Sequence, residues 1–440
     1  MKVLKFGGTS VGSAQRMKDV AKLITDGEQK IVVLSAMSGT TNTLVEISDY
    51  LYKKNPEGAN EIINRLESKY KQHIDELYST EEYKQKTLEF VKSVFDYIRS
   101  FTKDIFTLFE EKVILAQGEI ISTNMVTNYL CEQGVKAYLI PALEFMRTDK
   151  NSEPDLNYIR EKLAAQLEAH AGQDIYITQG FICRNAYGEI DNLQRGGSDY
   201  TASLIGAAIN ASEIQIWTDI DGMHDNDPRV VDKTSPVRQL HFEEAAELAY
   251  FGAKILHPTC IQPAKYANIP VRLLNTMEPS APGTLISNDT EKGKIKAVAA
   301  KDNITAIKIK SSRMLLAYGF LRKVFEIFES YQTAIDMVCT SEVGVSMSID
   351  NTKHLNEIVN DLKKYGTVTV DHDMCIVCVV GDLEWENVGF EAKALDAMRD
   401  IPVRMISFGG SNYNISFLIR ECDKKKALQS LSDVLFNTGK

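Results

Sequence analysis

Short apolar runs alternate with stretches of helical periodicity over the first 290 residues. Unbroken apolar runs, typical of strands buried on both faces of a parallel sheet, occur at residues 30–37, 136–142, 174–182 and 213–220. Segments with helical spacing of apolar side chains lie between them, as at 155–170 and 200–210. This alternation predicts a three-layer α/β domain with a mostly parallel sheet.

Residues 56–112 interrupt the alternation. They are rich in Lys, Glu, Tyr and Leu at helical spacing and poor in glycine, which predicts a helical insertion. A dimer contact or a lid is an alternative role for it. The α/β domain is expected to close at residues 272–287, where two prolines and a glycine cluster, and a polar linker follows at 288–294.

The order of elements changes after the linker. The patterns predict, in turn, a strand at 303–311, a helix at 319–331, a hairpin of 334–341 and 344–350, a helix at 352–366 and a strand at 367–372. This β-α-β-β-α-β order is the ferredoxin-like arrangement.

The same order then begins again and stops one strand short. Its elements are a strand at 375–382, a helix at 388–400, strands at 402–410 and 412–420, and a helix at 423–436. A missing last strand would leave a sheet edge exposed, and residues 294–302 form a spare strand. We therefore expect the second unit to consist of 294–302 plus 373–440, with the first unit, 303–372, inserted within it.

Composition limits the class of protein. At 440 residues, 44% hydrophobic and 25% charged, the chain is that of a globular protein of two or three domains. The net charge of −10 disfavours nonspecific nucleic-acid binding. No apolar run reaches the ~18 residues of a membrane span, and Gly7 to Ser10 interrupt any signal-peptide core. A cytoplasmic protein is expected.

The cysteines and histidines suggest no metal site. Seven scattered cysteines do not form a disulfide framework. Cys375 and Cys378 make a lone C-x-x-C within an apolar run, without a second pair, so they are expected in the core of a strand. His257 is expected to be a core histidine, with a catalytic base as the alternative, and the other histidines lack metal-site spacing.

The first cluster of candidate chemistry is KFGGTSVG, residues 5–12, after a short apolar strand. Gly7 and Gly8 let backbone amides approach an anion, and Lys5 places a cation beside it. The G-x-x-x-x-G-K-[ST] spacing of a P-loop is absent. By itself the stretch fits either a phosphate site or an ordinary strand-to-helix turn.

The second cluster, RGGSDYTA at residues 195–202, combines a glycine pair with Arg195 and Asp199. A helix is predicted from Tyr200 onward, and its amino terminus suits an anion. Arg195 offers a bidentate guanidinium to a carboxylate. The alternative is a tight turn with a surface ion pair.

Two further clusters follow. WTDIDGMHDNDPRVV, residues 217–231, crowds acidic and turn residues at the carboxyl end of a predicted strand, the edge at which open α/β sheets bind ligands. A solvated acidic turn is the alternative, and the EF-hand frame of a calcium loop is absent. EEAAELAYFGAKILHP, residues 243–258, predicts a helix capped by Gly252. Lys254 then either reaches nucleotide phosphates or lies along the surface.

These four motifs, with LSAMSGTTN at 34–42 and QGE at 117–119, resemble the aspartate kinases in content and order. The two ferredoxin-like units resemble that family's tandem ACT domains, and TSEVGVSMSID and SFGGSNYNISFLI resemble their strand pairs. The resemblance covers nearly the whole chain and is strongest to the single-function, lysine-sensitive type. It implies an amino acid kinase fold over residues 1–290, followed by the tandem ACT domains.

The resemblance implies ATP-dependent phosphorylation of the L-aspartate side chain to 4-phospho-L-aspartate, the first step of lysine, threonine and methionine biosynthesis, with Mg²⁺ as the partner of the triphosphate. Lys5 would neutralise the transferred phosphoryl group and Asp199 would organise the site. The implied substrate-binding residues are Ser35, Thr41, Glu119, Arg195, Gly197 and Ser198. The implied nucleotide-binding residues are Lys5, Gly7, Gly8, Ser10, Thr218, Asp219, His224, Arg229 and Lys254.

An effector site in the first ACT unit is also implied. Its residues would be Met314, Ala317, Gly319, Phe320, Leu321, Asp336, Thr340, Ser341 and Glu342. Asp336 and Glu342 suit a cationic effector, so lysine is expected. The sequence departs from the family at His224, where a tyrosine is usual near the adenine, and at Leu316 and Ala317, where polar residues are usual.

Two other functions stay open on the sequence. One is a related kinase of the same fold that acts on glutamate, an acylated glutamate or a nucleoside monophosphate, and the other is a non-catalytic amino-acid sensor. The tandem ACT tail favours aspartate, and the intact Lys5, Glu119, Arg195 and Asp199 argue against lost catalysis. Edge-to-edge pairing of ACT sheets, as in the family, implies a homodimer or a homotetramer.

Overall fold

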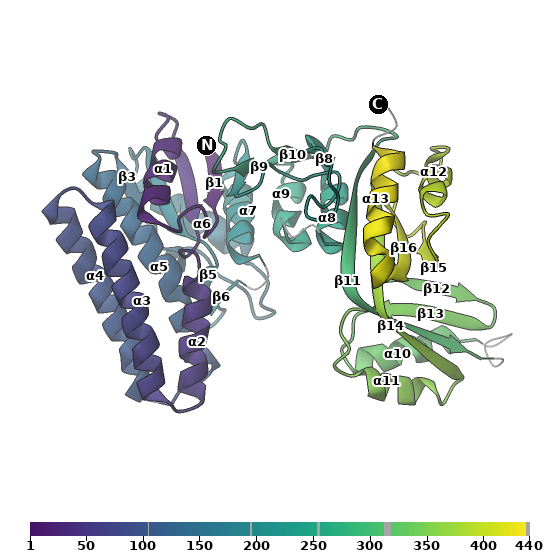
Figure 1. Ribbon diagram of the computed structural model, residues 1–440. Helices are drawn as coiled ribbons and strands as arrows, with labels where there is room; N and C mark the ends of the chain where they lie inside the picture. Colours follow the sequence, from purple (N-terminus) through teal and green to yellow (C-terminus); the bar gives the residue numbers. More distant parts are fainter. Residues whose placement is uncertain (104, 194–195, 253–255, 312–317, 437–440) are drawn as a thin grey trace. The chain divides into compact units, whose positions relative to one another are not determined.

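The computed structural model describes residues 1–103, 105–193, 196–252, 256–311 and 318–436. The chain forms two compact units, residues 1–223 with 256–288 and residues 224–255 with 289–440 (Figure 1).

A mostly parallel sheet organises the first unit, as predicted. Within this unit the strand order is β3-β4-β2-β1-β7-β9-β10, and only β10 runs antiparallel to its neighbour. The strands are β1 (Lys2–Phe6), β2 (Lys30–Leu34), β3 (Ala137–Leu139), β4 (Ile175–Gln179), β7 (Ile214–Thr218), β9 (Val271–Asn275) and β10 (Thr284–Ser287). A separate hairpin joins β5 (Ile182–Arg184) to β6 (Ile190–Asn192).

Helices cover both faces of this sheet, which gives three layers. Leu4 and Phe6 pack into one core with α1 (Ala14–Ile24), α2 (Thr40–Tyr52) and α5 (Leu108–Glu132). The alternate side chains are buried on the other face, where α7 (Gly197–Ile209) packs against β1, β2 and β7. Next to α7 lie α6 (Leu156–Ala169) and α9 (Gln262–Tyr266).

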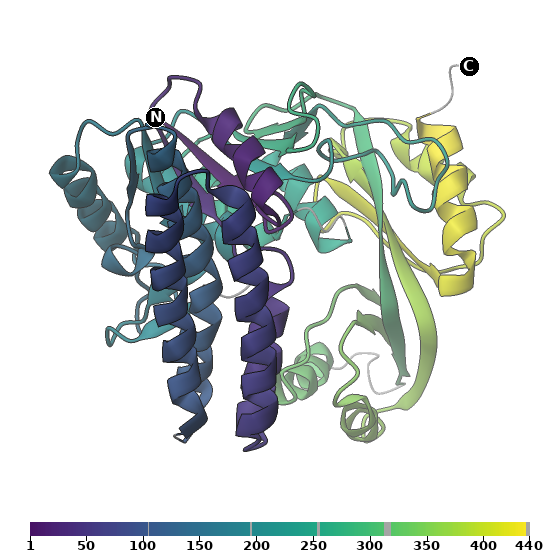
Figure 2. The ribbon, with the colours of Figure 1, turned by 60° about the vertical axis from the view of Figure 1, so that its left-hand side comes forward.

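The predicted insertion is a pair of long helices, α3 (Pro56–Leu77) and α4 (Glu81–Ser100), which lie side by side (Figure 2). Pro56 occupies the first turn of α3 and Asn55 caps it, which is a favoured start for a helix. Both helices bury an apolar stripe that is continuous with the core of the sheet. The insertion is therefore an integral part of this unit, which disfavours a role as a lid.

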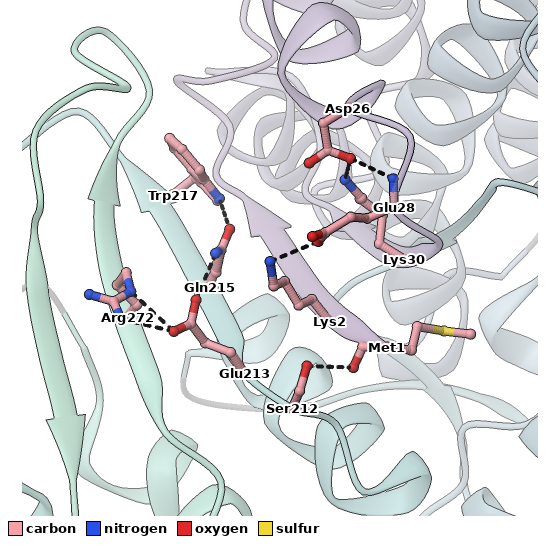
Figure 3. A network of polar contacts seen from close by, with 10 residues as sticks. All are labelled: Met1, Lys2, Asp26, Glu28, Lys30, Ser212, Glu213, Gln215, Trp217 and Arg272. Carbon is pink, nitrogen blue, oxygen red and sulfur yellow. Dashed lines mark hydrogen bonds and ion pairs between the residues drawn. The ribbon is translucent and has the colours of Figure 1, made fainter.

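Polar contacts tie together the amino ends of the strands (Figure 3). The ammonium of Lys30 is almost fully buried and pairs with Asp26. Arg272 on β9 donates to Glu213, just before β7, at 3.0 and 3.1 Å. These ion pairs occupy the edge of the sheet opposite to the carboxyl ends, which are left for ligand chemistry.

A six-stranded antiparallel sheet of order β12-β13-β11-β14-β16-β15 organises the second unit. The strands are β11 (Ile295–Lys310), β12 (Val338–Ser341), β13 (Gly344–Ile349), β14 (Thr367–Gly381), β15 (Val403–Ser407) and β16 (Asn414–Arg420). The helices are α10 (Phe320–Ser330), α11 (Leu355–Leu362), α12 (Phe390–Ala397) and α13 (Lys424–Leu435). Two separate hydrophobic cores, one under α10 and α11 and one under α12 and α13, correspond to two ferredoxin-like halves.

The halves share their central strands. Residues 294–302 and 303–311, which the sequence predicts as two strands, form the single strand β11, and the two strands predicted at 367–372 and 375–382 form β14. The first part of β11 pairs with the last part of β14, in the half of the sheet that contains β16. The last part of β11 pairs with β13.

Residues 224–255 belong to the second compact unit and not to the first, although the sequence predicts one domain up to residue 290. They include β8 (Gln239–His241) and α8 (Phe242–Tyr250). The helix α8 packs against β11 and β14. Gly252 follows it with a φ of 122°, and a Cβ there would lie 2.2 Å from the Ala300 carbonyl oxygen, so only glycine fits.

Candidate functional site

The site is built around the carboxyl end of β1. This strand lies between β2 and β7, so Lys5, its next-to-last residue, emerges at the central carboxyl edge of the sheet. The Lys5 Nζ atom lies 2.7 Å from Oδ1 of Asp199, in the first turn of α7, and the side chains are only 11% and 16% exposed. A partly dehydrated ion pair of this kind holds a cation in place for an anionic ligand.

The turn after β1 is held against the turn after β2. A Cβ at Gly8 would lie 2.8 Å from the Ala36 carbonyl oxygen, so this approach requires glycine. The Ser38 amide donates to the Gly8 carbonyl at 3.1 Å. Ser10 is fully buried and its hydroxyl pairs with Thr276 at 2.7 Å, so it serves the packing of this turn.

The start of α7 completes a second wall. Gly196 has a φ of 67° and precedes the helix, which begins at Gly197, three residues before the predicted Tyr200. The Ser198 hydroxyl lies 3.0 Å from that of Ser35, at the end of β2. A Cβ at Gly180 would lie 2.8 Å from the backbone of Ser198, so a glycine there lets α7 approach the sheet.

Glu119 lies at the back of the site on α5. It is 4% exposed, and burial raises its pKa to about 7, an effect that the nearby backbone of Ala36 partly offsets. Its Oε2 atom is buried without a hydrogen-bond partner among the described residues. A buried acceptor of this kind is stabilised by a ligand that brings a cationic donor.

A cavity of about 410 Å³ joins these groups. Of the predicted residues it brings together Lys5, Gly8, Ser35, Thr41, Glu119, Gly197, Ser198 and Asp199. Sequence reasoning missed others that line it: Ala36, Met37, Ser38, Gly39, Asn42, Phe181 and Gly196. Phe181 has a left-handed backbone with a φ of 69°, a strained conformation for a bulky non-glycine residue. Arg195 lies outside the described residues.

The predicted nucleotide residues are divided between the two units. Thr218 ends β7 beside β1, its hydroxyl accepts from the Ile220 amide at 3.1 Å, and Asp219 after it is exposed. His224 and Arg229 belong to the second unit. His224 contacts the Thr234 hydroxyl at 2.9 Å. The exposed Arg229 forms a bidentate ion pair with Asp227. Lys254 is not among the residues that the structure describes.

The predicted effector residues lie in the first ferredoxin-like half. Gly319, with a φ of 80°, precedes α10 and is followed by the buried Phe320 and the exposed Leu321. Thr340 and Ser341 end β12, and Glu342 follows them in exposed positions. Met314 and Ala317 fall outside the described part of the chain.

Asp336 is already paired, with residues outside this half. Its Oδ1 atom lies 2.8 Å from the ammonium of Lys301 and accepts a hydrogen bond of 2.7 Å from the Tyr250 hydroxyl. Burial, followed by the Asp336 contact, raises the pKa of Tyr250 to about 12. A cationic effector at Asp336 would therefore compete with Lys301.

The described ranges contain neither a metal-binding cluster nor a membrane-spanning helix. Within them, no three His, Cys, Asp or Glu side chains are grouped to hold a metal ion. No helix there is long and apolar enough to cross a bilayer. Cys375 and Cys378 are fully buried in β14, and His257 caps the short helix that follows it.

Family models match both units. That of the amino acid kinase family matches residues 1–275, and that of an ACT domain matches residues 377–435. Aspartokinase 1, chloroplastic, from Arabidopsis thaliana is 35% identical over 99% of this chain and 80% of its own length. Lysine-sensitive aspartokinase 3 from Escherichia coli is 32% identical over 99% of both chains.

Solved structures of E. coli aspartokinase III are similar along the whole chain. The complex with aspartate and ADP, described as the R-state, has a TM-score of 0.84 at 31% identity and covers 99% of this chain and 100% of that chain. The complex with lysine and aspartate, described as the T-state, has a TM-score of 0.81 at 32% identity and covers 99% of each.

Proposed function

The chain belongs to the amino acid kinase family and, within it, to the aspartokinases, and from this membership we propose its reaction and its regulation. It is an aspartate kinase, which transfers the γ-phosphoryl group of ATP to the side-chain carboxylate of L-aspartate and forms 4-phospho-L-aspartate. Lysine inhibits it by feedback through its ACT domains.

One observation carries the assignment of the active site. A single cavity holds the Lys5–Asp199 ion pair, the hydroxyls of Ser35 and Ser198, and Glu119, whose Oε2 atom has no hydrogen-bond partner among the described residues. Cationic, neutral and anionic groups on different walls suit a small zwitterion that has an additional carboxylate.

We assign the binding of aspartate to residues of this cavity. Glu119, once ionised, accepts from the α-ammonium, because its buried Oε2 lacks a partner among the described residues. The backbone amides in the first turn of α7, at Gly197 and Ser198, are assigned as donors to a carboxylate. Ser35 and Thr41 add hydroxyl contacts, and Arg195 is assigned to the α-carboxylate for its bidentate geometry.

The remaining side-chain carboxylate is the nucleophile. One of its oxygens forms a bond to the γ-phosphorus while the bond to the β,γ-bridging oxygen breaks and ADP departs. No proton needs to move, because the attacking group is already an anion. Lys5 stabilises the negative charge on the transferred phosphoryl group, and Asp199 holds the Lys5 ammonium in place. The chain therefore contributes positioning and charge stabilisation.

The amide of Gly8 and the residues Thr218 and Asp219 are assigned to the nucleotide, whereas the Gly7 amide already donates to the Trp217 carbonyl at 3.3 Å. They end β1 and β7, which are neighbours in the sheet. Mg²⁺ would enter with the triphosphate and neutralise part of its charge, since it takes most of its ligands from phosphate oxygens and water. The exposed carboxylate of Asp219 has the right chemistry to assist it. His224, Arg229 and Lys254 are further candidates for the base and the phosphates.

We further propose the domain boundaries given by the sequence, with a catalytic domain at 1–290 and ACT domains at 303–372 and at 294–302 plus 373–440. The exchange of strands between the two halves of the sheet supports the ACT boundaries. Homodimers or homotetramers would form through these domains. Exposed apolar side chains in the second half, among them Trp385 and Val388, support such contacts.

A hydroxamate assay over several acceptors tests the reaction. Hydroxylamine traps an acyl phosphate as the hydroxamate, so colour appears only when a carboxylate is phosphorylated. We expect ATP-dependent product with L-aspartate and almost none with L-glutamate or N-acetyl-L-glutamate. Product with glutamate alone would indicate a different kinase of the same fold, and no product with any acceptor would indicate an amino-acid sensor.

A further inference from the structure

The two ACT halves repeat each other residue by residue at several landmarks. Gly319 and Gly389, with φ of 80° and 93°, precede α10 and α12. Asn303 and Asp373, with φ of 60° and 54°, sit at the bends of β11 and β14. Residues with a positive φ at the same point of each repeat align the two repeats, whatever their side chains are.

At the bend of β11, a cation lies between two carboxylates. Lys301 precedes Asn303 by two residues. Its ammonium lies 2.8 Å from Asp336, just before β12, and 2.9 Å from Asp350, just after β13.

At the bend of β14, the equivalent positions have the opposite charges. Asp371 precedes Asp373 by two residues and pairs with Arg404 of β15, Nε to Oδ2 2.8 Å. Arg420 follows Ile419 at the end of β16, as Asp350 follows Ile349 at the end of β13. The bend of β14 thus has two arginines around one central carboxylate, where the bend of β11 has two aspartates around one central lysine.

These reversed charges surround a cavity of about 720 Å³. Its lining includes Asp371, His372, Asp373, Arg404, Arg420 and Cys422. The Arg404 side chain is 29% exposed. Arg420 is exposed and has no ion-pair partner in the part of the chain that the structure describes.

We propose that this cavity binds a small anion with a carboxylate or phosphate group between Arg404 and Arg420. Guanidinium groups recognise both kinds of anion through two parallel hydrogen bonds. The ion pair with Asp371 orients Arg404, which leaves Arg420 as the main source of free positive charge. Asp373, exposed at the rim, opposes the anion and limits its charge.

This site is distinct from the catalytic cavity, since all of its residues lie in the second unit. It is also distinct from the proposed lysine site, since its charges are reversed. Binding at this site therefore does not depend on turnover of aspartate, and the two proposals fail independently.

Cys422 provides a local probe, because its exposed thiol lines the cavity. The full chain is treated with N-ethylmaleimide, a neutral reagent, in the presence of inorganic phosphate or succinate, with ionic strength held constant by chloride. Peptide mass spectrometry follows the alkylation of Cys422. Cys131, half-buried in the first unit, serves as the internal reference.

We expect saturating phosphate or succinate to slow alkylation of Cys422 by roughly threefold or more, without an effect on Cys131. Protection by one anion alone identifies its class. Arg420→Gln should abolish the protection and Asp373→Asn should strengthen it. Arg399→Gln, an exposed arginine of the same half that pairs with Asp396, should leave it unchanged. Circular dichroism confirms that the variants are folded.

Two results would overturn the proposal. One is an alkylation rate for Cys422 that neither phosphate nor succinate changes relative to chloride. The other is protection of the same size in the wild type and in Arg420→Gln.

Discussion

The proposed mechanism assigns the largest contribution of any single residue in the catalytic cavity to the Lys5 ammonium. Lys5→Ala should lower kcat by roughly a thousandfold, equivalent to about 4 kcal/mol of transition-state stabilisation. The matched control is Lys2→Ala, on the same strand, which pairs with Glu28 at the opposite edge of the sheet. It should change kcat by less than about twofold, because a surface ion pair contributes little. Equal effects of the two substitutions on kcat would contradict the role of Lys5.

The titration of Glu119 predicts the pH dependence of substrate binding. Its pKa is raised to about 7 by burial, so the carboxyl is neutral below that pH and ionised above it. Only the ionised form attracts the ammonium of aspartate. The KM for aspartate should therefore rise as the pH falls below 7, by up to about tenfold per unit.

Glu119→Gln provides the test of this assignment. It should have a high KM for aspartate that does not change between pH 8 and pH 6. A wild-type KM that stays flat over the same range would show that Glu119 does not bind the ammonium.

The residues that belong to motifs could be predicted from the sequence, whereas those that depend on tertiary contacts could not. Lys5, Glu119 and Asp199 were predicted from motifs, and they line one cavity. Phe181 was missed, because its left-handed backbone depends on its contacts with α7 and the β5–β6 hairpin and has no signature in sequence. The contact of Ser10 with Thr276 also joins residues far apart in the chain.

At the scale of elements, the insertion helix α3 supports the substrate cavity. The buried hydroxyl of Tyr70 lies 2.8 Å from that of Thr40, the first residue of α2, and Thr41 next to it lines the cavity. Tyr70→Phe should destabilise the protein by about 1 kcal/mol, because it leaves the Thr40 hydroxyl unpaired. It should also raise the KM for aspartate.

Thermal unfolding and steady-state kinetics measure these two effects. The control is Tyr97→Phe, on α4 and 48% exposed, which should change neither quantity. If Tyr70→Phe matches the wild type in both, α3 has no part in positioning α2.

Periodicity predicted where the strands lie but not where each strand ends. Periodicity predicted the strand segments of the ACT halves, but it divided β11 and β14 into two strands each. The breaks were placed at Asn303 and Asp373, whose positive φ introduces a register shift between the strands but does not end them. At the edge of the first sheet, the strand predicted at 136–142 shortens to β3, because Pro141 cannot donate to the ladder.

At the scale of the whole molecule, the proposed inhibition by lysine predicts a role for Asp336. If lysine binds there, its ammonium displaces that of Lys301, and the contact between Asp336 and Tyr250 at the end of α8 changes. Asp336→Asn should raise the lysine concentration for half-inhibition by roughly tenfold or more, because a charge-assisted contact is lost. Inhibition curves at fixed aspartate and ATP measure this shift.

The matched substitution is Asp361→Asn. Asp361 is a carboxylate of the same half that pairs with Lys364 on the surface. Its removal should leave the inhibition curve in place. If the half-inhibition concentration is unchanged in Asp336→Asn, lysine does not bind at Asp336.

The transfer of phosphate to the aspartate side chain is tested most directly by isotope labelling. The enzyme is given ATP, Mg²⁺ and L-aspartate with ¹⁸O in the side-chain carboxylate, and hydroxylamine then cleaves the product at its carbonyl carbon. Attack of the carboxylate on the γ-phosphorus predicts released phosphate that carries one ¹⁸O atom, seen as an isotope-shifted ³¹P NMR signal. Phosphate without ¹⁸O, or no release that depends on aspartate, would contradict it.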